Sequence, residues 1–175
     1  MNKNISINGV KIGKDYPPYI IAEMSANHNG DIESALKIIE NAATAGASAV
    51  KIQTYRPDTI TLDCDLPDFQ IKDGLWEGRT LYDLYEWAHT PWDWHKDLFD
   101  HAKKCGITIF SSPFDNTAVN LLEDLNSPAY NSVAPITCDD ILFWQRNNLC
   151  LNMKLLPEPR GIKLLLVLMR QGGVH

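Results

Sequence analysis

The sequence predicts an α/β fold built on parallel strands. Three short apolar runs rich in β-branched residues, at 19–22, 49–54 and 107–112, have the composition of strands that are buried on both faces. Between them, apolar residues recur every three or four positions, as they do on one face of a helix. A strand, a helix and a strand within residues 19–54 indicate a right-handed crossover between parallel neighbours.

Length and composition are those of one ordinary globular domain. The chain has 175 residues, of which 45% are hydrophobic and 22% are charged. Its formal net charge of -6 argues against a nucleic-acid-binding protein, which normally has a basic face. No apolar run approaches the roughly 20 residues that cross a bilayer, and the first 18 residues lack the apolar core of a signal peptide. The four cysteines form no Cys-x-x-Cys pair, so we expect incidental or buried thiols in a cytoplasmic protein.

Local signals mark the remaining elements. Residues 5–12 alternate around Asn8-Gly9, which predicts a hairpin. Asp31 and Thr90 are residue types that cap helices, and each precedes a helical pattern. Helices are expected at 31–45, 81–89, 90–105 and 115–124.

Three histidines are spaced six residues apart: His89, His95 and His101. This spacing rotates each one by about 120° around a helix and prevents them from binding one metal ion together. We therefore expect surface histidines.

Polar side chains stand at or near the ends of the predicted strands. Glu23 follows the first apolar run, and Lys51 and Gln53 lie two apart on one face of the second. In parallel α/β folds the loops at the carboxyl ends of strands hold the chemistry. A lysine in a buried strand is costly unless a carboxylate or an anion meets it. Lys51 is therefore expected either to pair with Glu23 or to bind a substrate phosphate or carboxylate, and Gln53 on the same face favours the second role.

The third predicted strand ends in hydroxyl groups, Ser111 and Ser112. Hydroxyls and free amides at such a strand end suit a phosphate group. A serine-capped turn explains Ser112 nearly as well.

The pattern changes after Tyr130. A fourth strand is due, but Pro135 would interrupt the ladder of a strand at 131–135. From there to residue 175 no clean helix is found, 155–161 is turn-like, and 162–169 is apolar without amphipathic spacing. We therefore predict a domain at 1–130 and an atypical, irregular tail at 131–175.

Up to Tyr130 the chain resembles the sialic acid synthase family. The resemblance is carried by Ile-Ala-Glu-Met-Ser-Ala-Asn-His-Asn-Gly (21–30), Ala-Val-Lys-Ile-Gln-Thr-Tyr (49–55) and Phe-Ser-Ser-Pro-Phe-Asp (110–115). Residues 75–85 and 90–95 look most like the pseudaminic acid synthase branch of that family. Several long motifs in the same order are a specific signal, unlike one short pattern.

This resemblance implies a TIM (β/α)8 barrel, of which the chain holds the first three to four β/α units. It implies condensation of phosphoenolpyruvate with an open-chain N-acetylated amino sugar, of the 2,4-diacetamido-2,4,6-trideoxy-altropyranose type, to give a nonulosonic acid and phosphate. In the family, Mn²⁺ or Mg²⁺ polarises the sugar aldehyde, and an antifreeze-like domain completes a partner's site in a homodimer. An N-acetylneuraminate or legionaminate synthase and a non-catalytic remnant are the alternatives.

Matching motifs assign expected roles to five residues. Glu23 is the expected catalytic carboxylate, which handles sugar hydroxyl protons. Lys51 is expected to hold phosphoenolpyruvate through its charge, and Ser112 to donate to its phosphate. Gln53 and Asn27 are expected to bind substrate, because they lie in matching motifs.

The chain departs from the family pattern directly after Tyr130. The family continues Lys-Ile-Ala-Ser, whose lysine and serine also hold phosphoenolpyruvate, whereas this chain reads Asn131-Ser132-Val133-Ala134. The metal-binding histidines and the antifreeze-like domain, which come later in the family, have no counterpart here. A reading-frame shift explains the change, since AAA ATA GCG TCN without two adenines becomes AAT AGC GTC, or Asn-Ser-Val. We therefore expect a truncated, inactive form.

Overall fold

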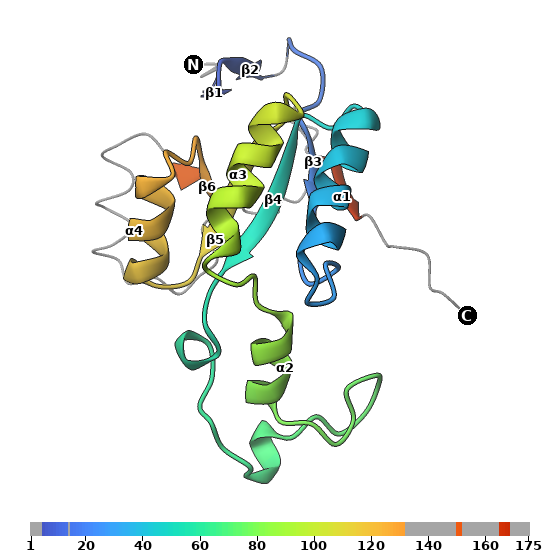
Figure 1. Ribbon diagram of the computed structural model, residues 1–175, viewed down its shortest axis with the longest axis vertical. Coiled ribbons are helices and arrows are strands. Elements are labelled where there is room, and N and C mark those ends of the chain that lie inside the picture. The colour runs from blue at the N-terminus through green and yellow to red at the C-terminus, as the bar shows by residue number, and fades with distance from the viewer. Residues whose placement is uncertain (1–4, 14, 132–149, 152–164, 169–175) are drawn as a thin grey trace.

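The centre of the molecule is a parallel sheet of six strands (Figure 1). The computed structural model describes residues 5–13, 15–131, 150–151 and 165–168, the last two ranges by their backbone alone. The strand order is β7-β6-β5-β4-β3-β8, and all neighbours run parallel. The strands are β3 (Ile20–Glu23), β4 (Ala49–Thr54), β5 (Thr108–Pro113), β6 (Tyr130–Asn131), β7 (Cys150–Leu151) and β8 (Leu165–Leu168). The order β3 to β7 follows the chain, as in a singly wound barrel, and within the described residues the sheet is open between β7 and β8.

The predicted α/β class and its three leading strands are confirmed. The strand β4 spans the same residues, 49–54, as its predicted apolar run, and β3 and β5 are shifted by one residue from theirs. Each strand could be recognised because its run is short and rich in β-branched residues, as buried parallel strands are.

The described residues form four α-helices, α1 (Ile32–Thr44), α2 (Leu81–Ala88), α3 (Trp94–Lys104) and α4 (Asn116–Asp124), and two short 3-10 helices, η1 (Pro57–Thr59) and η2 (Pro67–Phe69). Asp31 caps α1 as predicted, accepting a hydrogen bond from the backbone N–H of Ser34. The predicted start of the third helix is wrong, because the cap position is Asp93 and Thr90 is buried before it. The backbone N–H of Trp94 donates to the Pro91 carbonyl, so a turn separates Thr90 from the helix. No helix among the described residues combines the length and the apolar character that crossing a bilayer requires.

Helices α1, α3 and α4 cover one face of the sheet. The larger core lies between this face and helices α1 and α3. It contains Ala22, Val50, Ile52 and Ile109 from the strands, Ala35, Ile38, Ile39 and Ala42 from α1, and Leu98 and Ala102 from α3. Helix α4 packs on the same face through Val119 and Leu122, which contact Tyr130 of β6. Helix α2 buries none of its residues and lies beyond the carboxyl end of β4 (Figure 1).

In the part of the chain that the structure describes, the opposite face of the sheet carries no helix, and a hairpin covers its amino end. Strands β1 (Ile5–Ile7) and β2 (Val10–Ile12) are antiparallel, as predicted. Asn8 and Gly9 both have positive φ, which the two-residue turn requires. The side chains of Ile7 and Ile12 pack against Tyr19, Ile21, Ala49, Phe110 and Ala129 of the sheet region. These apolar side chains cover the amino-terminal half of this face, and the polar residues of the sheet follow toward the carboxyl ends of the strands.

The predicted irregular tail contains two short strands. Strand β7 pairs with β6, and β8 pairs with the far side of β3 from Ile20↔Leu165 to Glu23↔Leu168. The segment 162–169 was apolar without helical spacing, which agrees with a strand inside it. The expected effects of Pro135 and the expected turn at 155–161 lie outside the described residues.

Candidate active site

Strand register brings the predicted polar residues together on the helix-free face. Glu23 of β3 is opposite Lys51 of β4, and Gln53 of β4 is opposite Ser112 of β5. Residues two apart on a strand share a face, so Lys51 and Gln53 lie on the same side as Glu23 and Ser112. The polar residues therefore form a polar layer of two levels at the carboxyl end. Glu23 and Lys51 lie level with Phe110, and Gln53 and Ser112 lie one level further along the strands. The level before them holds Ile21 and Ala49, which belong to the apolar cluster.

Glu23 and Lys51 form a buried ion pair. Lys51 Nζ lies 2.7 Å from Glu23 Oε2, and the side chains are 10% and 8% exposed for Lys51 and Glu23. Burial raises the pKa of the Glu23 carboxyl, although the Lys51 ammonium acts in the opposite direction. The second carboxylate oxygen, Oε1, is buried and has no hydrogen-bond partner among the described residues. The ion pair thus engages Oε2 and leaves the buried Oε1 outside it. A backbone hydrogen bond with Ser25 also lowers the pKa of the carboxyl, by less than Lys51 does.

Ser112 lies at the end of β5 and contacts the next strand. The Asn131 side-chain amide of β6 donates to Ser112 Oγ over 3.0 Å, and both residues are buried. Sequence reasoning treated Asn131 only as a departure from the family pattern. A fourth strand was expected at 131–135, and the strand that pairs with β5 is shorter and begins one residue earlier, at Tyr130–Asn131.

Asn27 uses part of its hydrogen-bonding capacity within its own loop. Its side-chain amide donates to the Met24 carbonyl over 2.8 Å, and its backbone N–H donates to the same carbonyl. The Met24 N–H in turn donates to the Lys51 carbonyl, so the loop after β3 is tied to β4. Asn27 lies beside the candidate site and helps to shape the loop that borders it.

A second polar cluster lies on the helix side of the same strand ends. His95 Nδ1 is 3.0 Å from the Pro91 carbonyl, and Nε2 is 2.8 Å from Thr54 Oγ1, which lies 2.6 Å from Ser111 Oγ. Because a carbonyl only accepts, Nδ1 carries the proton, and Thr54 donates to Nε2. Burial lowers the pKa of His95, in agreement with a neutral ring. The network fixes the strand positions adjacent to Gln53 and Ser112.

The prediction that His95 is a surface residue is wrong, because its side chain is fully buried. The six-residue spacing of the histidines shows only that they cannot bind one metal ion together, and it does not indicate whether each one is buried. A different signal was present: His95 stands three residues before Leu98 and seven before Ala102, on the buried face of α3.

The residues described here do not form a metal site. Within the described part of the chain, no three His, Cys, Asp or Glu side chains are grouped so that they could hold a metal ion. At the candidate site, the Glu23 carboxylate already faces the Lys51 ammonium, which a divalent cation would have to displace.

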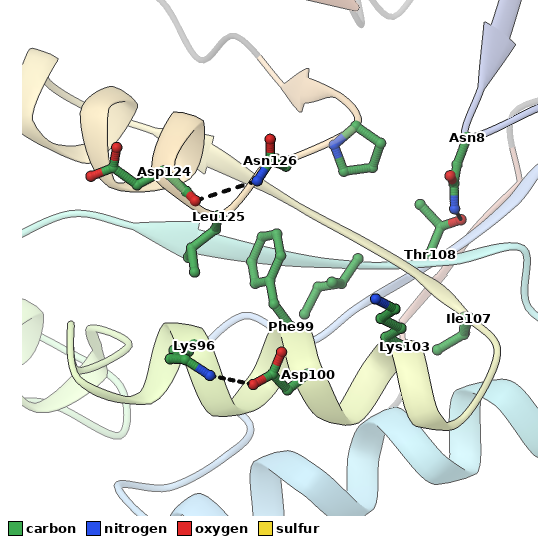
Figure 2. Close-up of a pocket in the computed structure, with 12 residues that line it drawn as sticks. Asn8, Lys96, Phe99, Asp100, Lys103, Ile107, Thr108, Asp124, Leu125 and Asn126 are labelled. Atoms are coloured by element: carbon green, nitrogen blue, oxygen red, sulfur yellow. Dashed lines mark hydrogen bonds and ion pairs between the residues drawn. The ribbon is translucent and has the colours of Figure 1, made fainter.

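A groove of about 700 Å³ lies elsewhere, between α3 and α4 near the amino end of β5 (Figure 2). Its floor includes Phe99, Ile107 and Leu125, and the Lys96–Asp100 ion pair stands at its rim. Thr108 marks the amino end of β5, whereas Ser112 is at the other end. The groove is therefore separate from the Glu23–Lys51 site.

Comparisons with known proteins agree with this arrangement. The sequence profile of the NeuB family matches residues 38–142. The chain is 53% identical over 116 residues to the pseudaminic acid synthase of Campylobacter jejuni subsp. jejuni serotype O:2, covering 66% of this chain and 34% of that protein. The N,N'-diacetyllegionaminic acid synthase of the same organism is 38% identical over 107 residues, covering 61% of this chain and 32% of that protein.

The fold has a counterpart of known structure. The N-acetylneuraminic acid (sialic acid) synthetase of Leptospira borgpetersenii serovar Hardjo-bovis superimposes with a TM-score of 0.64 at 26% identity, covering 85% of this chain and 47% of that one. The chain spans about a third of the length of the curated relatives it matches. Because the family profile matches more than half of its residues, this chain belongs to the NeuB family.

Proposed function

We propose that the chain corresponds to the amino-terminal part of a pseudaminic acid synthase. Such an enzyme condenses phosphoenolpyruvate with an open-chain N-acetylated amino sugar of the 2,4-diacetamido-2,4,6-trideoxy-altropyranose type. The observation that carries the proposal is the buried Glu23–Lys51 pair, which adjoins Ser112 at the carboxyl ends of parallel strands. The identities of 53% and 38% to the two synthases of one organism favour the pseudaminic over the legionaminic substrate.

Lys51 and Ser112 are the proposed holders of phosphoenolpyruvate. The ammonium group supplies the positive charge that its phosphate and carboxylate require, and the hydroxyl supplies a directional hydrogen bond. Gln53, opposite Ser112 on the same face, adds an amide to this layer. Asn27, at the border of the site, is the proposed contact for the sugar.

Glu23 is the proposed acid–base group. When the methylene carbon of phosphoenolpyruvate bonds to the aldehyde carbon of the sugar, the aldehyde oxygen becomes an alkoxide and takes up a proton. Water then adds to the cationic carbon that carries the phosphate, and the C–O bond to phosphate breaks. A carboxyl whose pKa is raised by burial exchanges protons more readily near neutral pH, and its free oxygen Oε1 is available for this exchange.

This chain covers about a third of the length of its relatives, so other parts of the reaction would depend on regions of the relatives outside the match. The family resemblance implies a divalent metal and a homodimer, and the cysteine pattern a cytoplasmic location; all three stay proposals for the whole enzyme. No step above is assigned to a metal, because the described residues do not form a site for one.

Titration calorimetry with phosphoenolpyruvate tests the proposed site. Lys51→Ala removes a charge-assisted contact, so binding should weaken by about 2–3 kcal/mol. Lys37→Ala is the matched control, because Lys37 also forms an ion pair but is exposed on α1. Equal binding by the Lys51→Ala variant and the unmodified chain would contradict the role of Lys51. Absence of binding in every protein tested would support the non-catalytic remnant.

A further inference from the structure

We propose that Asn131 is a positioning residue of the anion site, where it orients the Ser112 hydroxyl toward a tetrahedral oxyanion. The inference rests on the proposed function, because it takes the phosphate group of the substrate as the ligand. It gives a role to Asn131, which stands where the family pattern has a substrate-binding lysine.

The position of Asn131 follows from strand pairing. Ser111 of β5 is opposite Tyr130 of β6, so the next residue on each strand, Ser112 and Asn131, shares the helix-free face. Tyr130 packs on the other face against α4, in agreement with this alternation. Asn131 is 5% exposed and Ser112 is 1% exposed, so water does not compete freely for their hydrogen bond.

The hydrogen bond from Asn131 limits the direction in which the Ser112 hydroxyl can donate. Asn131 Nδ2 donates to Ser112 Oγ over 3.0 Å. A hydroxyl has one hydrogen, and Oγ already accepts, so that hydrogen remains for another acceptor. The amide of Asn131 has two hydrogens, of which this bond uses one. No further acceptor among the described residues takes these two hydrogens, so both can be offered to the oxygens of an anion at this strand end.

The charge balance makes these neutral donors important. The Lys51 ammonium is the cation assigned to the anion site, and the Glu23 carboxylate, 2.7 Å from it, offsets its charge. An anion that enters this layer thus meets a pair with little net charge. Its affinity must depend strongly on oriented N–H and O–H groups, which stabilise a charged oxygen without a counter-ion.

Sulfate binding to the 175-residue chain tests the proposal, because sulfate is tetrahedral and stays a dianion throughout the mildly acidic and neutral range. The variants are Asn131→Ala, which removes the orienting amide, and Asn131→Asp, which replaces it with an acceptor of the same shape. Asn120→Ala on the exposed side of α4 is the control for an asparagine substitution away from the site. Circular dichroism verifies that each variant keeps its secondary structure.

Asn131→Ala should weaken sulfate binding about 3- to 10-fold, the value of one neutral hydrogen bond. Asn131→Asp should weaken it on the order of 100-fold near neutral pH, because the Ser112 hydroxyl turns to the new carboxylate and that carboxylate repels the ligand. As the pH is lowered and the new carboxyl becomes protonated, the ratio between this variant and the unmodified chain should shrink. A role in packing alone would not produce this pH dependence. Asn120→Ala should bind as the unmodified chain does.

Two further variants separate failure of this inference from failure of the proposed function. If Lys51→Ala and Ser112→Ala lose sulfate binding while both Asn131 variants retain it, the anion site stands and the role of Asn131 is wrong. If the unmodified chain and all variants fail to bind sulfate and phosphoenolpyruvate, the proposed site itself is wrong. Equal weakening by Asn131→Ala and Asn131→Asp at every pH would also overturn the orienting role.

Discussion

The buried Glu23–Lys51 pair should be replaceable by apolar residues without loss of stability. We compare Glu23→Leu, Lys51→Met and the double variant with the unmodified chain. Each single change leaves one buried charge without its partner and should lower the free energy of unfolding by about 3–5 kcal/mol. The double change removes both charges and should leave stability unchanged or raise it by about 1–4 kcal/mol.

The geometry of the pair explains this expectation. At 2.7 Å, and with an effective dielectric constant of about 20, the attraction between the two charges is about 6 kcal/mol. Both side chains are about nine-tenths buried, and removing each ion from water costs several kcal/mol, so the two effects nearly cancel. Glu23 Oε1 adds a penalty, because it is buried without a hydrogen-bond donor. The raised pKa of Glu23 points the same way, since burial outweighs the stabilisation of the carboxylate by Lys51.

Urea unfolding followed by tryptophan fluorescence measures the four proteins, and equal slopes would show that all unfold to a comparable extent. The comparison also depends on pH. Because the pKa of Glu23 is raised in the folded state, its contribution to stability is lost as the pH rises from 4.5 through the folded value. The advantage of the double variant should therefore grow with pH in that window. A double variant clearly less stable than the unmodified chain would refute the reasoning and show that the pair stabilises the fold.

Three further predictions concern other parts of the chain. Burial lowers the pKa values of His28 and His95, so the free energy of unfolding should fall as the pH falls below 6.5, by up to about 1.4 kcal/mol per pH unit for each histidine. Urea unfolding at several pH values measures this dependence, and a flat profile would contradict it. Asp115→Ala removes the acceptor of the first N–H groups of α4 and should cost about 1 kcal/mol of stability in thermal unfolding, whereas the neighbouring exposed Asn116→Ala should have little effect. A polypeptide of these 175 residues should release no phosphate from phosphoenolpyruvate and the amino sugar, because it spans about a third of the length of its relatives. Phosphate release that requires both substrates and Mn²⁺, and that Glu23→Ala abolishes, would overturn this prediction.

The order of elements was predictable because the local signals are strong. A β-branched run fixes β4, an aspartate accepts from the first turn of α1, and Asn8-Gly9 supplies the two positive φ angles of a hairpin turn. In each case the residues that determine the structure are neighbours in sequence. The pairing of Glu23 with Lys51 was one of the two roles expected for Lys51, and the less favoured one, although consecutive parallel strands are usually adjacent.

The missed features depend on contacts between distant segments. Thr90 has the composition of a helix cap, but packing buries it and moves the helix start to Asp93. The spacing of His95 from Leu98 and Ala102 signalled its burial, but its contact with Thr54 could be recognised only after α3 had been placed on the sheet. Strand β8 pairs with β3 from 145 positions further along the chain, a pairing that no local pattern encodes.

One pattern across the strands does identify the end of the sheet where a site can form. On the helix-free face four adjacent segments change from apolar to polar within two residues. The changes are Ile21 to Glu23, Ala49 to Lys51, Phe110 to Ser112 and Ala129 to Asn131. The change comes one level later on β5 than on β4, because Phe110 is paired with Lys51 and Ser112 with Gln53. A single buried polar residue in a strand is common enough to have a structural cause, but the same change on adjacent segments gathers several polar groups at one end of the sheet, where they can satisfy one another or a ligand. The hairpin covers the apolar side of this boundary. The direction of the change, rather than the identity of any one residue, therefore predicts the end of the sheet where an anion would bind.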